Sequence, residues 1–110
     1  MNKIDTNTDI SVILPLFTNN NTTTNTINSI LEQSFENFEL IIIDNRECSE
    51  SLDKIDSRIK YVLNKKEKTT AASLKQGVLL SQSKYIAVID ENSIAEKDRL
   101  QKQIDYLLRL

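Results

Sequence analysis

The sequence Phe38-Glu39-Leu40-Ile41-Ile42-Ile43-Asp44-Asn45 is a nearly continuous apolar run that ends on two polar side chains. A second run, Tyr85-Ile86-Ala87-Val88-Ile89-Asp90-Glu91-Asn92, ends in the same way. Continuous β-branched runs are typical of strands covered on both faces, as in parallel sheets. In open α/β sheets, ligands bind just outside the carboxyl ends of the strands. The two runs therefore predict a polar site there, for a nucleotide or a metal-bound phosphate.

Apolar periodicity outward from these runs predicts the other elements. We expect strands at 10–16, 38–43, 58–63 and 84–89, helices at 22–33, 69–81 and 95–110, a loop with a short helix at 47–55 and a charged turn at 64–68. Alternation of this kind predicts right-handed crossovers and a parallel, doubly wound α/β sheet flanked by helices. Residues 1–9 are expected to be a disordered lead-in to a single domain over 10–110.

The helix predicted over 69–81 carries Ala71, Leu74 and Val78 at helical spacing, which indicates the face that packs on the sheet. The same helix contains Gly77, the only glycine of the chain. We interpret this glycine as a point of close packing between helix and sheet. There is no glycine-rich phosphate loop, so the fingerprints of Rossmann dinucleotide sites and P-loops are absent.

Composition restricts the classes of function. The 110 residues suffice for one small domain, and the net charge of -2 argues against non-specific nucleic-acid binding, which needs a basic surface. The single cysteine, Cys48, cannot form an internal disulfide, so a cytoplasmic location is expected. No apolar run approaches the roughly 20 residues of a membrane span. The chain has no histidine, so any histidine base or ligand must come from elsewhere.

Polar and aromatic residues at the predicted strand ends are the candidates for binding. Phe17 follows the first strand and can stack on a base, with a place in the core as the alternative. Asp44 and Asn45 can hydrogen-bond a uracil or a ribose, and a turn or helix cap is their alternative. Oxygen ligands such as those of the segment Asp90-Glu91-Asn92 suit a hard divalent cation that also grips a diphosphate. Capping of the final helix is the alternative for that segment.

Several segments lie in order along the chain at the spacing of a known family: Ser11–Thr18, Ile27–Asp44, Asp56–Tyr61, Ala71–Gly77, Tyr85–Asp90 and Asp98–Leu100. Together they resemble the nucleotide-binding half of family 2 glycosyltransferases, which have the GT-A fold. The resemblance implies a Rossmann-like half-domain with a four-stranded parallel sheet in the order 3-2-1-4. It also implies binding of a UDP-type nucleotide sugar, with Mn²⁺ or Mg²⁺, for sugar transfer to a carbohydrate or lipid-linked acceptor.

The chain departs from the family pattern at several motif positions. The family's Asp-Asp pair is Asp44-Asn45 here, and the arginine of its helix motif is replaced by Leu74. The Asp-x-Asp metal motif ends on the neutral Asn92, which weakens a divalent site, because metal affinity depends on ligand charge. Glu91 is the candidate that substitutes for the lost carboxylate. The resemblance thus assigns Phe17, Asp44, Asn45 and Asp90 to the nucleotide sugar, and Glu91 and Asn92 to the metal.

The family's second half, which holds the acceptor site and the general base, has no counterpart in these residues. We therefore expect donor binding without catalysis in this truncated form. The rival interpretation is a non-catalytic interaction domain that keeps the GT-A scaffold and has a decayed donor site. The leucine-rich final helix, over 95–110, predicts self-association or pairing with a missing second half.

Overall fold

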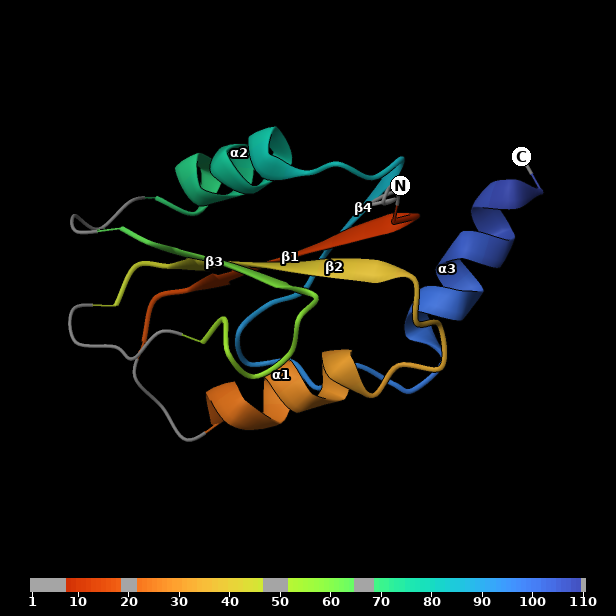
Figure 1. The fold of residues 1–110 in the computed structure, drawn as a ribbon, viewed down its shortest axis with the longest axis horizontal. Helices are drawn as coiled ribbons and strands as arrows, with labels where there is room; N and C mark the ends of the chain where they lie inside the picture. Colours follow the sequence, from red (N-terminus) through yellow and green to blue (C-terminus); the bar gives the residue numbers. More distant parts are fainter. Residues whose placement is uncertain (1–7, 19–21, 47–51, 65–68, 110) are drawn as a thin grey trace.

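The computed structural model describes residues 8–18, 22–46, 52–64 and 69–109. Its elements are β1 (Ile10–Leu16), α1 (Thr22–Leu31), β2 (Phe38–Asp44), β3 (Ile59–Leu63), α2 (Thr70–Leu80), β4 (Tyr85–Val88) and α3 (Arg99–Leu108). The strands form one parallel sheet in the order β3-β2-β1-β4. Helix α2 lies on one face of the sheet, and α1 lies on the other with α3 towards one end (Figure 1). The α/β class and the order 3-2-1-4 are confirmed.

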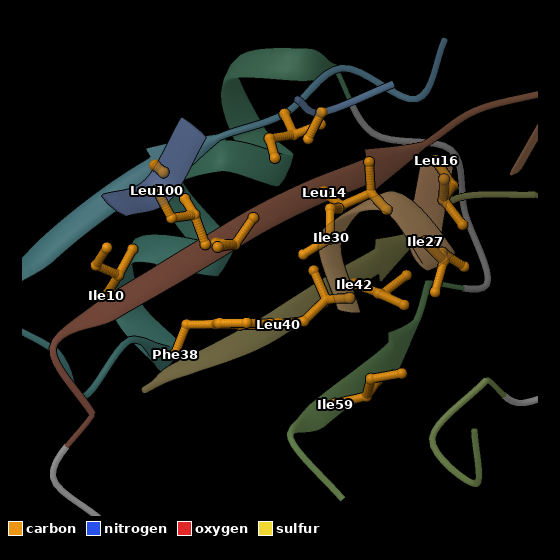
Figure 2. Packing of buried hydrophobic residues seen from close by; sticks show 14 of the residues in the cluster. Ile10, Leu14, Leu16, Ile27, Ile30, Phe38, Leu40, Ile42, Ile59 and Leu100 are labelled. Atoms are coloured by element: carbon orange, nitrogen blue, oxygen red, sulfur yellow. The ribbon is translucent and has the colours of Figure 1, made fainter. Parts of the chain in front are cut away.

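Strands β1 and β2 are buried along their whole length, as their apolar runs predict. Side chains alternate between the two faces of a strand, so each run supplies two packing layers. Figure 2 shows Leu14 and Leu16 of β1 beside Ile30 and Ile27 of α1, in the main core. The opposite face carries a smaller cluster beneath α2, made by Ile13, Ile41 and Ile43.

Gly77 lies where α2 packs against β1. A Cβ atom built on this residue would lie 2.6 Å from Cγ2 of Ile13, which is fully buried. A side chain therefore cannot be accommodated unless the Ile13 side chain, the helix or the sheet shifts. The interpretation of Gly77 as a close-packing residue is confirmed.

The face of α2 that meets the sheet differs from the predicted one. Ser73 and Gly77 are buried, and Leu74 is half-buried against the smaller cluster. Ala71 and Val78 are exposed, so the prediction is wrong for both. The close approach at Gly77 explains the difference, because it requires the smallest side chains, and not the most apolar ones, to face the strands.

Helix α3 begins at Arg99, so the predicted start at Ala95 is wrong. The preceding loop runs along α1 and uses its backbone groups for tertiary hydrogen bonds. The Ala95 N–H donates to Oγ of Ser29 at 3.0 Å, and the Lys97 carbonyl accepts from the Ser34 N–H at 2.9 Å. These contacts compete with helix formation, which the apolar pattern could not show.

Other boundaries differ by a residue or two, as expected for element ends. Helix α1 ends at Leu31, within the predicted range 22–33. Residues 52–55 contain no helix, whereas 47–51 of that predicted segment lie outside the described residues. The same holds for 65–68 of the charged turn and 1–7 of the lead-in. Within the lead-in, the Asp9 backbone bonds with the backbones of Asn37 and Tyr85.

Strand β4 is covered on one face only. Its side chains Ile86 and Val88 are 43% and 45% exposed on the sheet face that carries α2, because α2 packs on β1 and β2 instead. Five apolar residues are exposed on β4 and on the last turns of α2 and are together called the β4 patch: Val78, Leu79, Leu80, Ile86 and Val88. Leu100 and Ile104 of α3 are buried, while Leu108 is 70% exposed.

Candidate functional site

The carboxyl ends of the strands form an edge that we call stepped, because β4 ends earlier along the sheet than β1 and β2. Strand β4 ends at Val88, opposite Ile13 in the middle of β1, whereas β2 continues to Asp44 at the end of β1. Because all strands are parallel, Asp44 and the segment after β4, which contains Asp90, lie at the same edge of the sheet, as predicted. The shorter β4 leaves room beside the end of β1, and Glu91 reaches into it.

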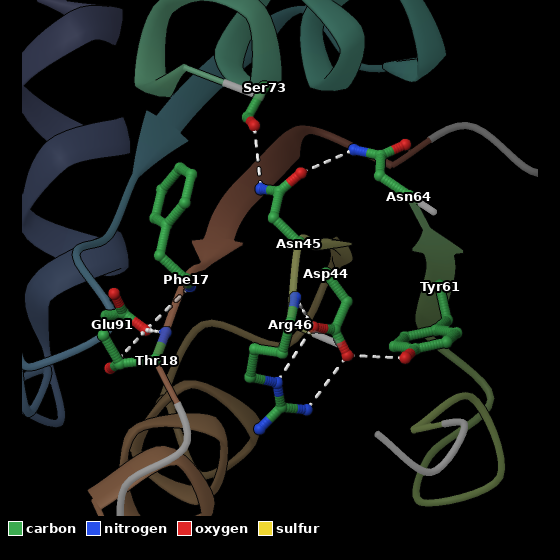
Figure 3. A network of polar contacts seen from close by, with 9 residues as sticks. All are labelled: Phe17, Thr18, Asp44, Asn45, Arg46, Tyr61, Asn64, Ser73 and Glu91. Atoms are coloured by element: carbon green, nitrogen blue, oxygen red, sulfur yellow. Dashed lines mark hydrogen bonds and ion pairs between the residues drawn. The ribbon is translucent and has the colours of Figure 1, made fainter. Parts of the chain in front are cut away.

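Glu91 joins the segment after β4 to the end of β1. Its Oε1 accepts the backbone N–H groups of Phe17 and Thr18 at 3.0 and 3.1 Å, and the Thr18 hydroxyl at 3.3 Å (Figure 3). Its own carbonyl accepts from the Thr26 hydroxyl of α1 at 2.9 Å. The side chain is buried. Glu91 therefore points into the protein, and its carboxylate satisfies backbone donors of the strand end.

Asp90 and Asn92, on either side of Glu91, are exposed. Within the described ranges, no group of three or more His, Cys, Asp or Glu side chains is arranged to hold a metal ion. Since Glu91 is bonded to the β1 backbone, a divalent cation here would depend on Asp90, Asn92 and the oxygens of its own ligand. One carboxylate and one neutral amide are a weak set of ligands for a hard cation.

Asp44 is fully buried at the end of β2, on the face that carries α1. Its Oδ1 accepts from the N–H and the Nε of Arg46 at 3.0 and 2.9 Å. Its Oδ2 accepts from Nη2 of Arg46 at 2.9 Å and from the Tyr61 hydroxyl at 2.5 Å. A carboxylate offers about four lone-pair positions, so these bonds occupy it fully. The hydrogen bonds to Asp44 in turn raise the pKa of Arg46.

Asn45 points to the opposite face, towards α2. Its Nδ2 donates to Oγ of Ser73 at 2.9 Å, and its Oδ1 accepts from Nδ2 of Asn64 at 2.8 Å. Asn64 also exchanges hydrogen bonds with Gln76 of α2, at 3.0 and 3.1 Å. Asn45 is buried and ties the ends of β2 and β3 to α2. Both polar atoms of its side chain have partners within the protein.

The sequence neighbours Asp44 and Asn45 thus end on different faces of the sheet, because strand side chains alternate. Figure 3 shows the Phe17 ring on the side of Asn45 and Ser73, with Arg46 on the other side. The candidate residues therefore form two groups around the stepped edge and not one cluster. Whether they contact a ligand stays a prediction.

Arg46 and Tyr61 belong to this edge and were missed by sequence reasoning. The signal that could have found Arg46 is the repeated pattern Asp-x-Arg, which recurs at Asp56 and Arg58. The second pair repeats the contact in which both oxygens of a carboxylate bond to one guanidinium, which we call a fork. Oδ1 of Asp56 accepts from N and Nε of Arg58 at 2.9 and 3.0 Å, and its Oδ2 accepts from Nη2 at 3.1 Å.

The two forks differ in burial. Side chains are 10% and 0% exposed in the pair Arg46–Asp44, against 28% and 26% in Arg58–Asp56. Removing one partner of a buried pair costs about 3–5 kcal/mol, because a buried charge is left uncompensated, whereas exposed pairs contribute about 1 kcal/mol or less. The fork at the carboxyl edge is therefore the one that resists opening.

A family model described as glycosyl transferase family 2 matches residues 11–110. The chain belongs to this family. The bifunctional glycosyltransferase pgtA of Dictyostelium discoideum is 38% identical to this family 2 chain over 91 residues. That alignment covers 74% of this chain and 12% of pgtA, so the chain spans about an eighth of this relative's length.

Solved structures share the fold. TarS of S. aureus in complex with UDP-GlcNAc superposes with a TM-score of 0.75 at 17% identity, over 92% of this family 2 chain and 31% of the TarS chain. The mannosyltransferase PcManGT of Pyrobaculum calidifontis, in complex with GDP-Man and Mn²⁺, gives a TM-score of 0.75 at 13% identity, over 89% and 32% of the two chains. At these identities the likeness establishes the fold. None of the helices in the described ranges is long and apolar enough to cross a membrane.

Proposed function

We propose that the carboxyl edge of this sheet binds a nucleoside-diphosphate sugar of the UDP type. The intact protein would transfer the sugar to a carbohydrate or lipid-linked acceptor. The observation that carries the proposal is the convergence of polar strand ends at one edge of a sheet that belongs to glycosyltransferase family 2. In this proposal Phe17, Asp44, Asn45 and Asp90 belong to the edge that receives the donor. A cytoplasmic location, suggested by the single cysteine, is part of the same proposal.

The described residues favour donor binding over transfer. Transfer requires a general base within hydrogen-bond reach of the acceptor hydroxyl. Asp44 is fully occupied by Arg46 and Tyr61, and Glu91 is bonded to the backbone of β1. We therefore assign neither carboxylate as the base. The proposed role of these 110 residues is to hold the donor, with the acceptor and the base supplied by other residues.

The proposed cation is Mn²⁺ or Mg²⁺, bound together with the donor diphosphate. PcManGT, one of the structural neighbours, is described in complex with GDP-Man and Mn²⁺. In this chain the exposed Asp90 and Asn92 would face the cation, while Glu91 points inward. The neutral Asn92 makes the expected metal contribution small.

A second candidate is a non-catalytic interaction domain that keeps the GT-A scaffold. Two observations favour it. Both polar atoms of the Asn45 side chain bond within the protein, and the β4 patch leaves apolar surface uncovered. Exposed apolar surface that forms a large patch marks an interaction site.

Calorimetric titration of the chain with UDP distinguishes the two candidates. The donor-site proposal expects saturable binding of UDP, weaker binding of ADP, and a modest gain in affinity when Mn²⁺ is added. Heat of dilution only, with UDP, GDP and ADP alike and with or without Mn²⁺, would favour the interaction domain. A thermal melt of the same sample shows that the protein is folded during the titration.

A further inference from the structure

We infer that Arg46 is the residue of this edge that contacts the nucleotide, and that Asp44 and Tyr61 are positioning residues that hold its guanidinium. The inference rests on the proposed function. It assigns to Arg46 an oxygen acceptor of the ligand, either a phosphate oxygen or a carbonyl oxygen of the base.

The first argument is that Asp44 is out of reach. Its side chain has no exposed surface, and both oxygens already accept hydrogen bonds from Arg46 and Tyr61. A base N–H that approached Asp44 would find no lone pair to accept it. Direct contact would require Arg46 to leave first.

The second argument is that Arg46 does not leave easily. Its release would strip a buried carboxylate of its counter-charge, and a ligand that has to cause this would lose roughly a hundredfold or more in affinity. Arg46 is also only two positions from Asp44 in the chain, so little of the chain has to be ordered for the fork to form. A ligand that binds with Arg46 in place avoids this penalty.

The third argument is the orientation of the guanidinium. Its Nε and Nη2 atoms bond to Asp44, whereas Nη1 has no hydrogen-bond partner among the residues that the structure describes. The side chain is nine-tenths buried, with 10% of its surface exposed. Nη1 is a charged donor held in a fixed place by the fork. Arginine donors of this kind suit phosphate and carbonyl oxygens.

Because Arg46 covers Asp44, the protein donates the hydrogen bond to the ligand at this point and does not accept it. A free aspartate would accept a hydrogen bond from the ligand, whereas Arg46 donates one. The group recognised at this point is an oxygen, and its source is either the diphosphate or the base. Uridine, which lacks the phosphates, separates the two sources.

The test is calorimetric titration of the chain and of R46Q with UDP and with uridine. R46Q should weaken UDP binding about tenfold or more, which is the size of one charge-assisted hydrogen bond. An equal loss with uridine identifies a base carbonyl as the acceptor, and a loss confined to UDP identifies a phosphate. R58Q opens the matching fork at the other end of the sheet and should leave both affinities unchanged.

The positioning role of Asp44 is tested by D44N and by the double variant D44N/R46Q, which leaves no unpaired charge and keeps the test valid if R46Q does not fold. D44N should weaken UDP binding by releasing the fork, and the double variant should bind no more weakly than R46Q. Y61F, which loses the hydrogen bond to Asp44, should shift the affinity in the same direction and by less. If the losses of affinity caused by D44N and by R46Q multiply in the double variant, Asp44 contacts the ligand itself. That result would overturn the inference.

Two further outcomes also overturn it. If R46Q or D44N/R46Q binds UDP as tightly as the unchanged chain, or more tightly, Arg46 does not contact the ligand and only fills the space at the strand end. This includes the case in which only the variants bind, which leaves the proposed donor site standing. If neither the unchanged chain nor any folded variant binds a nucleotide, the proposed function and the inference fail together.

Discussion

A hydrogen bond joins Gln33, just after α1, to the backbone of Leu100 in the first turn of α3, 67 positions away. The Gln33 Oε1 accepts the Leu100 N–H at 3.0 Å, and its Nε2 donates to the carbonyls of Ser29 and Glu96 at 3.1 and 2.6 Å. The side chain is buried. One amide thus satisfies a free N–H of a helix start and fastens α3 and its preceding loop to α1.

Replacing Gln33 by alanine should lower the free energy of unfolding by about 1–3 kcal/mol, because buried polar groups lose their partners. Urea denaturation followed by circular dichroism measures this. S34A removes only the exposed hydrogen bond to Asp98 and should cost about 1 kcal/mol or less. Equal stability of Q33A and the unchanged chain would show that water replaces the amide without loss.

Glu39 should make the stability of the chain depend on pH at acid values. Burial alone would raise the pKa of Glu39, but hydrogen bonds from Lys60, Ser11 and the Gln82 backbone, together with the charge of Lys60, lower it below the ordinary 4.5. The folded state then binds its proton at a lower pH than the unfolded state. The stabilisation is present above about pH 4.5 and is lost as the pH falls through the lower folded pKa.

The E39Q variant should remove part of this acid dependence and lower the stability near neutral pH. It breaks the 2.7 Å ion pair between Lys60 and the Oε1 of Glu39. Denaturation curves between pH 2 and pH 7 measure both effects. Some dependence should remain, because hydrogen bonds from Arg58 also lower the pKa of Asp56. An E39Q curve parallel to that of the unchanged chain would contradict the role of Glu39.

Gly77→Ala should destabilise the protein although alanine favours helices. The added methyl group would lie 2.6 Å from Cγ2 of Ile13, and overpacking of this kind costs about 1–3 kcal/mol. The gain in helix propensity is about 1 kcal/mol and does not offset the upper part of that range. The midpoint of urea denaturation measures the balance. K75A, at an exposed position of the same helix, is the control and should change little.

Asn92→Asp should strengthen UDP binding only when Mn²⁺ is present. The new carboxylate would lie beside the exposed Asp90 and add charge to the weak set of metal ligands. The expected gain is about tenfold or more, from a charge-assisted contact of roughly 1.5–3 kcal/mol. Titrations with Mn²⁺ and with EDTA measure it. If the affinity for UDP does not respond to the metal in either the unchanged chain or N92D, the metal site has lost more than the charge of this one residue.

The β4 patch should cause self-association of this chain, or its pairing with a second half. Leu79 is 75% exposed and Ile86 is 43% exposed, and exposed apolar surface of this kind drives association. Light scattering over a range of concentrations should show a rise in mean mass. L79K and I86K should reduce the rise, whereas K84E, on the loop before β4, should not. A monomer at the highest concentration would refute the prediction.

The apolar runs of the sequence predicted the parallel strands, and the resemblance to family 2 glycosyltransferases supplied their order. The runs at β1 and β2 are apolar on both faces, so period and length alone identify buried parallel strands. The start of α3 was not predictable in the same way, because the hydrogen bond from Ala95 to Ser29 depends on the position of α1. Apolar periodicity contains no information about such a contact.

The candidate site was predictable in its location and not in its orientation. The polar residues after β2 and β4 lie at one edge, as parallel strands require. That Glu91 turns inward follows from the shorter β4, which leaves the N–H groups of Phe17 and Thr18 to be satisfied. The fork between Asp44 and Arg46 forms locally, and its repetition at Asp56 and Arg58 was the overlooked signal.

The central position of β1 separates its two strand pairings in time during synthesis of the chain. On one side β1 meets β2, where Ser11 bonds to Glu39, 28 positions later. On its other side it meets β4, and the contact of Thr8 with Ser83 spans 75 positions. During synthesis β1 therefore emerges before the other strands of this sheet, and the neighbour on its second side, β4, emerges last. Unpaired strand edges are prone to aggregation, so the edge of β1 that meets β4 is open to it until β4 has been made.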